Sequence, residues 1–386
     1  MNYILLLSIL FSFATTGHCE DYSIREKRAI LKRKYFNFTS PIKYYFDFTT
    51  KCNVIEKAFT HLEHYTCLKF ERSSKKFNHP GIFFVRSSEN SIEDNLKNQK
   101  PTILRVDKRC TNSVGCVKHW IGRALGLIPH VQRWDRNKYV KVHHREIEEK
   151  YKKLYKKIWG FNVRIINTAF DFGSIMNYAP DDHCENDEPA YTSKWNKLYD
   201  NMLGQRYEYS HNDIKLLNDF YCGHVCKNNK PKGCLNGAYP DPKDCTSCRC
   251  SKGYVGRLCG IVAPSSQGCG NAKLRATSQW KTLSINVTGV CNYLIMSQPR
   301  TKIAIKVVEA NLPKHKPCGT SLGLEVKNRY DKGTTGLCMC GKVKDVDMKP
   351  VFSQVLVQFN GQKAHYAKIQ YRAVSAKTAK EFEYKD

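Results

Sequence analysis

The segment HWIGRALGLIPHVQRWDR, which begins at His119, carries two imidazoles that could ligate a metal ion. A catalytic zinc site usually has three protein ligands and keeps one position open for water. The residues in between supply no third ligand: Trp120 can only donate a hydrogen bond, Arg123 carries a permanent charge, and Pro129 has no donor atom. His119 and His130 give two nitrogens at best, so the sequence predicts that no catalytic metal site forms here.

Helices and a strand are predicted on both sides of this segment. A strand is expected in KYYFDF and a helix in the following KCNVIEKAFTHLEHYTCLKF, where apolar residues recur every three or four positions. A last helix is expected in SHNDIKLLNDFYC, with Ser210 as N-cap and Asp213 three residues later. The apolar stripes are Ile55, Ala58, Phe59 and Leu62 in the first helix, and Ile214, Leu217 and Phe220 in the last.

A third helix is predicted in HREIEEKYKKLYKKIWGF, residues 144–161, with an apolar face and a charged face. The apolar face would contain Ile147, Tyr151, Leu154, Tyr155 and Ile158. Three i,i+4 pairs would join Glu146 to Lys150, Glu148 to Lys152 and Glu149 to Lys153. The lysines could dock on polyanions, although a solvated helix face is the default interpretation.

The 18 cysteines indicate disulfides in an oxidising environment. Six lie between Cys226 and Cys259, a run too short for a hydrophobic core, which predicts a small module held by about three bridges. From Cys269 to about Val374 the sequence alternates with period two, which predicts eight or so strands in a two-sheet sandwich. The alternating residues are Ile303, Ile305 and Val307, then Val355, Val357 and Phe359, then Ile369 and Tyr371.

The composition and the N-terminal segment indicate the number of domains and the cellular compartment of the protein. The 386 residues, 41% of them hydrophobic, suffice for two or three independently cored domains. The opening MNYILLLSILFSFATTGHCE is typical of a secretory signal peptide (1–19), and no other stretch approaches the ~20 apolar residues of a membrane span. Cleavage after Cys19 would leave an odd number of cysteines, whereas cleavage after Gly17 would keep an even one. Asn37 and Asn286 are candidate glycosylation sites of a secreted, extracellular protein.

The formal net charge of +28 suggests a polyanionic partner. For a secreted chain the candidates are sulfated glycosaminoglycans, acidic matrix proteins and anionic cell surfaces, and nucleic acid is not expected. The alternative is that the lysines serve only solubility.

Three stretches make the sequence resemble the astacin family of zinc metalloendopeptidases, in the nematode form that carries an EGF-like module and a CUB domain. They are ALG followed by RWDR (124–126 and 133–136), GSIMNY (173–178) and LGQRYEYSHNDIKLLNDFYC (203–222). The resemblance covers nearly the whole mature chain and implies an α+β fold: a metzincin/astacin-like protease domain, a small disulfide-rich EGF-like module and an all-β CUB sandwich. The expected divisions are 1–19 signal peptide, 20–34 short basic segment without a recognisable aspartate-switch propeptide, 35–222 astacin-like domain, 223–260 EGF-like module, 265–374 CUB domain and 375–386 C-terminal tail.

Active members of the family carry HExxHxxGxxH, whose three histidines hold zinc and whose glutamate takes a proton from the bound water. In this register His119 is the first histidine and Gly126 the glycine, while Trp120 stands for the glutamate. Arg123 and Pro129 stand for the other two histidines. The resemblance therefore implies no catalytic residue, His119 as the remnant of a metal site, and no cofactor.

Other family positions follow the same register. Met176 and Tyr178 occupy the Met-turn positions, where without zinc only a packing role remains. His130 stands where active relatives have a glutamate that pairs with the new N-terminus. Arg123 could hold a carboxylate or a peptide carbonyl in the cleft, or it could be paired with an acid such as Asp171.

The resemblance also implies disulfides, with Cys67 paired to Cys222 and Cys269 to Cys291. The cysteines expected in disulfides are Cys67, Cys222, Cys226, Cys234, Cys245, Cys248, Cys250, Cys259, Cys269 and Cys291. The pairing of the others stays open: Cys52, Cys110, Cys116, Cys184, Cys318, Cys338 and Cys340.

Two functions compete. The first is a secreted pseudoenzyme that acts by binding extracellular proteins or peptides, as a decoy for inhibitors or substrates, or by basic adhesion to polyanions. The second is an active zinc metalloendopeptidase with an unorthodox site. The ligand count favours the first.

Overall fold

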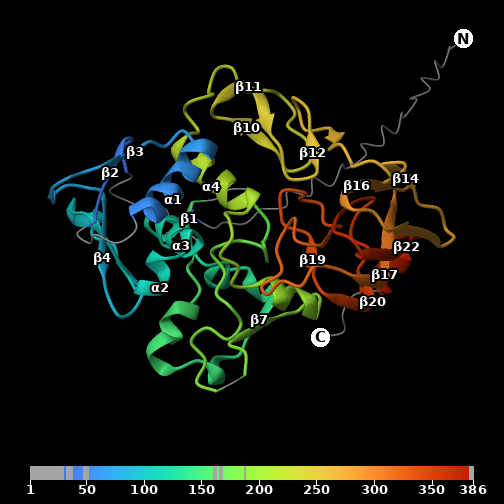
Figure 1. Ribbon diagram of the computed structural model, residues 1–386, viewed down its shortest axis with the longest axis horizontal. Coiled ribbons are helices and arrows are strands. Elements are labelled where there is room, and N and C mark those ends of the chain that lie inside the picture. The colour runs from blue at the N-terminus through green and yellow to red at the C-terminus, as the bar shows by residue number, and fades with distance from the viewer. Residues whose placement is uncertain are drawn as a thin grey trace, which may run out of the picture.

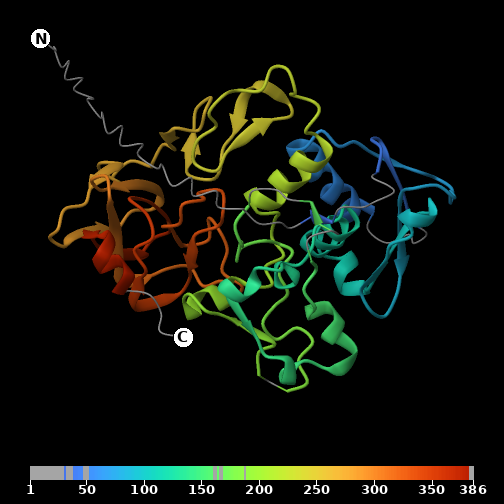
Figure 2. The ribbon, with the colours of Figure 1, turned by 180° about the vertical axis from the view of Figure 1, so that it is seen from behind.

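The computed structural model of the protein describes residues 30–31, 38–46, 52–159, 163–164, 168–186 and 188–381. The predicted signal peptide, Cys19 and Asn37 lie outside the described residues, as does the side chain of Cys52. Three parts follow one another along the chain and lie side by side (Figure 1). They are called here the N-terminal part (30–222), the cysteine-rich module (226–259) and the sandwich (273–375). Seen from behind, the module again lies above the junction of the other two parts (Figure 2).

A five-stranded sheet opens the N-terminal part. The predicted strand is β2 (Ile42–Phe46), and its residues are alternately buried and half-buried, as period two requires. The strand order is β3-β2-β4-β6-β5, with β5 antiparallel to its neighbour and the other strands parallel. The remaining bounds are β3 (Phe70–Arg72), β4 (Ile82–Arg86), β5 (Ser91–Glu93) and β6 (Thr102–Val106), with a 3₁₀ turn η1 (Leu96–Asn98) between β5 and β6.

Helices α1 (Cys52–Tyr65), α2 (Lys108–Thr111) and α3 (Val114–Ala124) pack beside this sheet. The prediction of α1 is confirmed, because Ile55, Ala58, Phe59 and Leu62 are all buried in one core with α3. Ser113 begins α3 by accepting a hydrogen bond from the backbone N–H of Cys116 at 3.2 Å. The cap fixes where α3 starts and thus where its later residues lie.

The last helix of this part, α4 (His211–Tyr221), is also confirmed, with a capping box formed by Ser210 and Asp213. Ile214 and Leu217 are buried, and Phe220 is half-buried. A disulfide joins Cys67 to Cys222, which ties the end of α1 to the end of α4. A further disulfide joins Cys110 to Cys116, across the turn between α2 and α3.

The predicted amphipathic helix over 144–161 is wrong. The structure has two 3₁₀ segments instead, η4 (His144–Glu146) and η5 (Glu149–Tyr155). Between them Ile147 is extended and bridges to Cys184, and the N–H groups of Glu148 and Glu185 bond across to His183 and Glu146. This pairing buries Ile147 and outweighs the local helical preference. The ion pairs also differ, because Lys150 contacts Glu148 at 3.2 Å and Lys152 contacts Glu149 at 2.6 Å.

Short pairings complete the N-terminal part. Strand β7 (Val140–Val142) pairs with β9 (Tyr191–Ser193), and β1 (Ile30–Leu31) pairs with β8 (Val163–Arg164), both antiparallel. The described residues of this region also contain the 3₁₀ segments η2 (His130–Gln132), η3 (Arg136–Lys138) and η7 (Lys197–Met202).

The cysteine-rich module contains three disulfides, which join Cys226 to Cys245, Cys234 to Cys248 and Cys250 to Cys259. Its strands are β10 (Tyr239–Asp241), β11 (Asp244–Arg249) and β12 (Tyr254–Val255), and β12 pairs with β13 (Ile261–Val262) beyond the module. The small core contains the second and third of these bridges with Ala238 and Tyr254, and Leu356 of the sandwich packs into it, so the bridges carry much of the stability of the module.

Two sheets form the sandwich, in the strand orders β14-β16-β21-β18-β19 and β15-β22-β17-β20. The predicted alternation is confirmed, since Ile303, Val357 and Ile369 and their period-two neighbours are buried. Disulfides join Cys269 to Cys291 and Cys318 to Cys340, while Cys338 is a buried free thiol and Cys184 a half-buried one. The bounds are β14 (Lys273–Arg275), β15 (Lys281–Ile285), β16 (Gly289–Met296), β17 (Thr301–Asn311), β18 (Leu324–Lys327), β19 (Leu337–Met339), β20 (Lys342–Met348), β21 (Gln354–Gly361) and β22 (Tyr366–Ser375). The residues assigned to a tail contain α5 (Ala376–Glu381).

The sandwich shares a hydrophobic core with the second half of the N-terminal part. One continuous cluster runs from Val131 to Leu203 and from Cys269 to Tyr371. Hydrogen bonds cross the same boundary: the backbone N–H of Cys318 donates to the carbonyl of Asn201 at 2.7 Å, and the guanidinium of Arg329 donates to that of Phe170 at 2.6 Å. Within the described residues, no helix combines the length and the apolarity needed to cross a membrane.

Candidate active site and its replaced ligands

His119 lies on α3 with its ring buried, and its Nδ1 atom is 2.9 Å from the carbonyl oxygen of Ile175. A carbonyl only accepts, so Nδ1 carries the ring proton and Nε2 keeps its lone pair. Burial, together with the charge of Arg206, holds the pKa of His119 well below its ordinary value, so the ring is neutral. A metal-binding histidine has the same tautomer and the same kind of backbone contact. The first ligand position thus keeps its supporting interactions.

Trp120 is the neighbour of His119 on α3 and is half-buried. Its ring meets the imidazole edge to face, with ring centroids 5.3 Å apart and planes at 84°. The indole offers one N–H and no acceptor, so it cannot take a proton from a water molecule. In the structure the indole packs against the imidazole ring of His119.

Arg123 lies one helical turn after His119, and its Nη1 donates a hydrogen bond of 3.3 Å to Oε1 of Gln132. Its charge is close enough to contribute to lowering the pKa of His119. Asp171, which the sequence suggested as a partner, is buried elsewhere and accepts hydrogen bonds from the N–H groups of Gly173 and Thr335. The partner that the structure gives to Arg123 is therefore an amide.

The chain turns back after α3 at Gly126, whose φ of 98° is accessible to glycine with little strain. Pro129 follows and is buried at the start of η2. The next residue, His130, is buried as well, and its Nδ1 lies 3.0 Å from the N–H of Asp171. That N–H can only donate, so Nδ1 of His130 is the acceptor and its lone pair is already engaged. The proton is left on Nε2, and a shifted loop would not make this ring a ligand without changing its tautomer.

The turn that contains Met176 lies under α3. A side chain on Gly122 would come within 3.0 Å of the Met176 sulfur, which shows how closely the turn packs against the helix. Tyr178 is buried, its ring lies 5.6 Å from that of Tyr155, and burial raises its pKa. Met176 and Tyr178 are thus packed side chains.

Two residues hold this turn: Arg206, to which the sequence gave no role, and Asp213, which the sequence placed only near the N-cap of α4. Arg206 donates from Nη1 to the carbonyl oxygens of Ile175 and Asn177 at 3.0 and 2.9 Å. The carboxylate of Asp213 accepts from the Ser174 hydroxyl at 2.6 Å and from the N–H of Ile175 at 3.1 Å. Arg206 stands in the LGQRYEYS stretch, so its position in that motif was the one available signal.

Arg133 and Asp135 of the RWDR stretch form a fully buried ion pair at 3.0 Å. The Arg133 guanidinium also donates to the carbonyl oxygen of Thr168 at 3.1 Å. A buried pair of this kind fixes local geometry more than it adds net stability. It anchors the segment that returns to the Met176 turn.

The donor set does not fit zinc. Of the three ligand positions, one has an imidazole, one a guanidinium and one a proline ring, and the His130 nitrogen that could substitute accepts a backbone hydrogen bond. A guanidinium next to the remaining imidazole repels a cation. Within the described residues there is no group of three or more histidine, cysteine, aspartate or glutamate side chains that could hold a metal ion.

Residues 30–222 match the family model described as Astacin, a peptidase family. The chain belongs to the astacin family. The Zinc metalloproteinase nas-34 of Caenorhabditis elegans is 28% identical over 367 residues, which cover 91% of this chain and 58% of that protein. The Zinc metalloproteinase dpy-31 of Brugia malayi is 28% identical over 336 residues, covering 82% and 55%. The chain thus spans a little over half the length of these curated relatives.

Among solved structures, the zinc-protease High choriolytic enzyme 1 from Oryzias latipes aligns with a TM-score of 0.44 and 22% identity. The alignment covers 50% of this chain and 98% of that structure.

Of the candidate glycosylation sites, Asn286 is exposed in the turn between β15 and β16.

Proposed function

We propose that this astacin homologue is secreted, has lost zinc binding and peptide-bond hydrolysis, and acts by binding. The observation that carries the proposal is Arg123, a fixed cation at a ligand position, with its guanidinium bonded to Gln132. The relatives are named zinc metalloproteinases, and their chemistry needs a metal-bound water and a base beside it. Here Trp120 stands at the position of the base and offers no acceptor.

The charges around His119 add to this argument. Arg206 and Arg123 both lower the pKa of the ring, which means that both disfavour positive charge at that place. The same two guanidinium groups would repel a divalent cation bound to Nε2 of His119. The repulsion would be stronger than for a proton, because the ion carries two charges. The position favours electron-rich groups such as a carboxylate or a carbonyl over a metal ion.

Zinc analysis of the purified protein, together with a peptidase assay, tests the loss of catalysis. After dialysis against metal-free buffer and re-addition of zinc, we expect far less than one zinc per chain and no casein cleavage that a chelator blocks. One zinc per chain with chelator-sensitive cleavage would establish the alternative, an active endopeptidase with an unorthodox site. The relative named Zinc metalloproteinase nas-34, prepared in parallel, serves as the control that the protocol retains zinc.

Binding could take two forms, as a decoy for the inhibitors or substrates of active relatives or as adhesion to polyanions. The net charge of +28 favours adhesion, because the attraction between a basic surface and a polyanion acts over several ångströms. The disulfides fit an extracellular environment, where sulfated glycans and anionic surfaces are available.

Chromatography tests the adhesion. We expect the protein to elute from heparin well above physiological salt, and at higher salt than from a sulfonate cation exchanger of equal charge density. Elution at or below physiological salt would assign the charge to solubility and leave the decoy role as the binding mode to test.

A further inference from the structure

A cleft of about 390 Å³ in the N-terminal part gathers basic side chains from segments far apart in the chain. We infer that this cleft binds the sulfate groups of a sulfated glycosaminoglycan, which deepens the proposed polyanion binding and rests on it. The cleft is called here the basic cleft, and its cationic and titratable lining residues are Arg136, Lys141, His144, Lys157 and Lys194. No carboxylate occurs among the described residues that line it.

Paired strands hold two of the lysines in place. Lys141 lies in β7 opposite Thr192 of β9, and Lys194 follows β9 directly. The backbone N–H of Lys194 donates to the carbonyl of Tyr139 at 2.8 Å, so the pairing continues past the end of β9. The backbone of the cleft is therefore fixed before any ligand arrives, which reduces the entropy cost of binding.

The surroundings of Arg136 point to an anionic ligand. It is only 4% exposed, and its Nη1 donates to the carbonyls of Val131 and Tyr155. In the described part of the chain its Nε has no hydrogen-bond partner and no carboxylate pairs with it. Burial lowers the pKa of Arg136 to about 10, so the group stays charged at neutral pH. A buried cation without a counter-charge is costly, and an anion in the cleft would offset that cost.

The neighbouring groups leave a positive field at the cleft. Burial, and after it the charge of Arg136, lowers the pKa of both Lys157 and His144. The acid whose charge acts on Lys157 is Asp135, and it is already paired with Arg133 at 3.0 Å. The charge of Arg136 thus acts on the other basic groups of the cleft, as it would on an anion bound there.

A larger cavity of about 630 Å³, between α1, α4, the cysteine-rich module and the sandwich, provides the contrast. Its charged side chains are paired with each other, Lys252 with Glu208 at 2.5 Å and Lys327 with Glu325 at 3.7 Å. Such paired charges leave little net attraction for an anion. The basic cleft is the smaller of the two, and what sets it apart as an anion site is its charge balance.

A glycan polymer fits the cleft better than an isolated ion. The volume is within the range of about 300–1,000 Å³ of small-ligand sites, so more than one anionic group can enter. Beside it Trp159 is 64% exposed, and the ammonium of Lys157 lies 5.8 Å from the centre of its ring. A large aromatic side chain is seldom this exposed, and its face can pack against a sugar ring that extends from the cleft.

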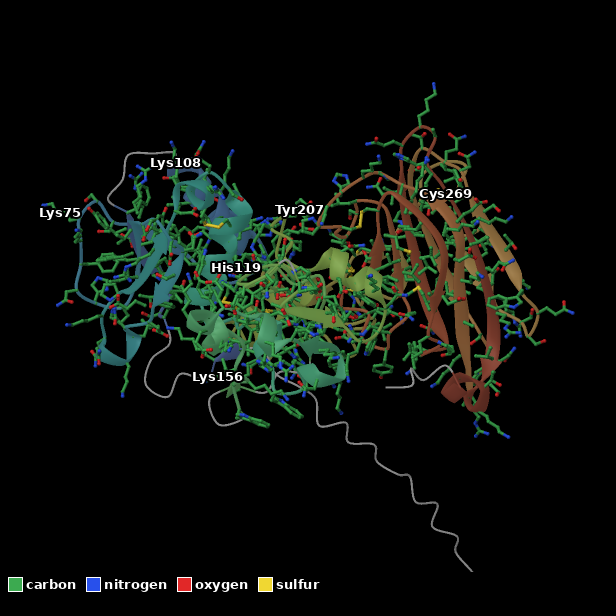
Figure 3. The ribbon with its side chains drawn as sticks, turned by 90° about the horizontal axis from the view of Figure 1, so that it is seen from below. Lys75, Lys108, His119, Lys156, Tyr207 and Cys269 are labelled. Carbon is green, nitrogen blue, oxygen red and sulfur yellow. A yellow bond between two sulfur atoms is a disulfide. The ribbon has the colours of Figure 1, made fainter. Side chains whose placement is uncertain are left out.

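The test uses a heparin-derived oligosaccharide of defined length and calorimetry at physiological salt. The cleft variant combines Lys141→Gln, Lys157→Gln and Lys194→Gln. The matched control combines Lys75→Gln, Lys97→Gln and Lys108→Gln, which removes the same charge from exposed positions. Figure 3 shows Lys75 at the left edge and Lys108 at the upper edge of the N-terminal part, whereas Lys156, which precedes the cleft residue Lys157, lies at its lower edge. Unchanged melting temperatures show that both variants are folded.

We expect the cleft variant to weaken the Kd by about tenfold or more, equivalent to about 1.4 kcal/mol, and the control by much less. Equal weakening by both variants would overturn the inference while the polyanion proposal stands. No binding by the wild type would overturn both. Equal affinity for desulfated heparin would exclude sulfate recognition, and tighter binding of single-stranded DNA of equal charge would point to nucleic acid instead.

Discussion

The hydroxyl of Ser174 donates a hydrogen bond of 2.6 Å to the carboxylate of Asp213, which joins the turn under α3 to the first turn of α4. The same carboxylate accepts from the backbone N–H groups of Ile175 and Ser210, so one buried side chain serves both a helix cap and the Met176 turn. The geometry of the turn under His119 is thus maintained by hydrogen bonds between protein groups.

Asp213→Ala should therefore destabilise the protein strongly. The substitution leaves several buried donors without a partner, and we expect a loss of about 2–4 kcal/mol. Ser210→Ala removes only the other half of the capping box and should cost about 1 kcal/mol. Calorimetric melting of the wild type and of the two variants measures both effects. Equal melting temperatures for wild type and Asp213→Ala would show that the hydrogen bonds of Asp213 add nothing to the stability of the protein.

Restoring the base alone should restore no activity. In the Trp120→Glu variant the new carboxylate has no metal-bound water to act on, so we expect no cleavage of a fluorogenic peptide. Any chelator-sensitive gain from this single change would mean that zinc is already bound.

Combining Trp120→Glu with Arg123→His and Pro129→His should raise the zinc content. His119 already has the ligand tautomer, and Gly126 already provides the turn. Mass spectrometry of the dialysed variant measures the metal. The double variant without Trp120→Glu is the matched control, because it should bind zinc without hydrolysing peptides.

A pH effect is expected at His61, whose Nδ1 accepts a hydrogen bond of 2.9 Å from the ammonium of Lys118. Burial, and next the charge of Lys118, lowers the pKa of His61 to about 4, against an ordinary value of 6.5. The unfolded chain therefore binds a proton more readily, and the stabilisation present above pH 6.5 is lost as the pH falls towards 4. Because the ring is half-buried, we expect a loss of about 1–2 kcal/mol. His61→Gln keeps an acceptor but does not titrate, so its melting temperature should fall less between pH 7 and pH 4.

The two free thiols among the described side chains should differ in reactivity. Cys184 is half-buried and Cys338 is buried, and burial raises the pKa of both. In native protein we expect slow alkylation of Cys184 and none of Cys338, while both react after unfolding without reductant. Peptide mapping identifies the labelled positions. Labelling of Cys318 or Cys340 in the unreduced protein would contradict the disulfide between them.

The elements that the sequence predicted correctly share a strong local signal. Helix α4 has a capping box and an apolar stripe, and the period-two apolar residues predicted in β17, β21 and β22 are buried. Local energetics and tertiary packing agree in these segments, so periodicity is a reliable guide.

The segment 144–161 shows where such reasoning fails. Its helical period is genuine, yet Ile147 gains more by bridging to Cys184 than a surface helix would give it. That partner is distant in sequence, and no local pattern reveals it. The roles of Arg206, Gln132 and His130 were hidden for the same reason, because each depends on a backbone or side-chain group brought near by folding.

The core that the sandwich shares with the N-terminal part also has a practical consequence. The sequence suggested separately cored units, but buried side chains such as Phe172, Tyr199 and Met202 pack in one cluster with the sandwich. A recombinant fragment that ends at Cys222 would present these side chains to water and should aggregate. A fragment cut at the boundary of the family match would then report on its exposed apolar surface, whereas a chain that includes both parts keeps that surface buried.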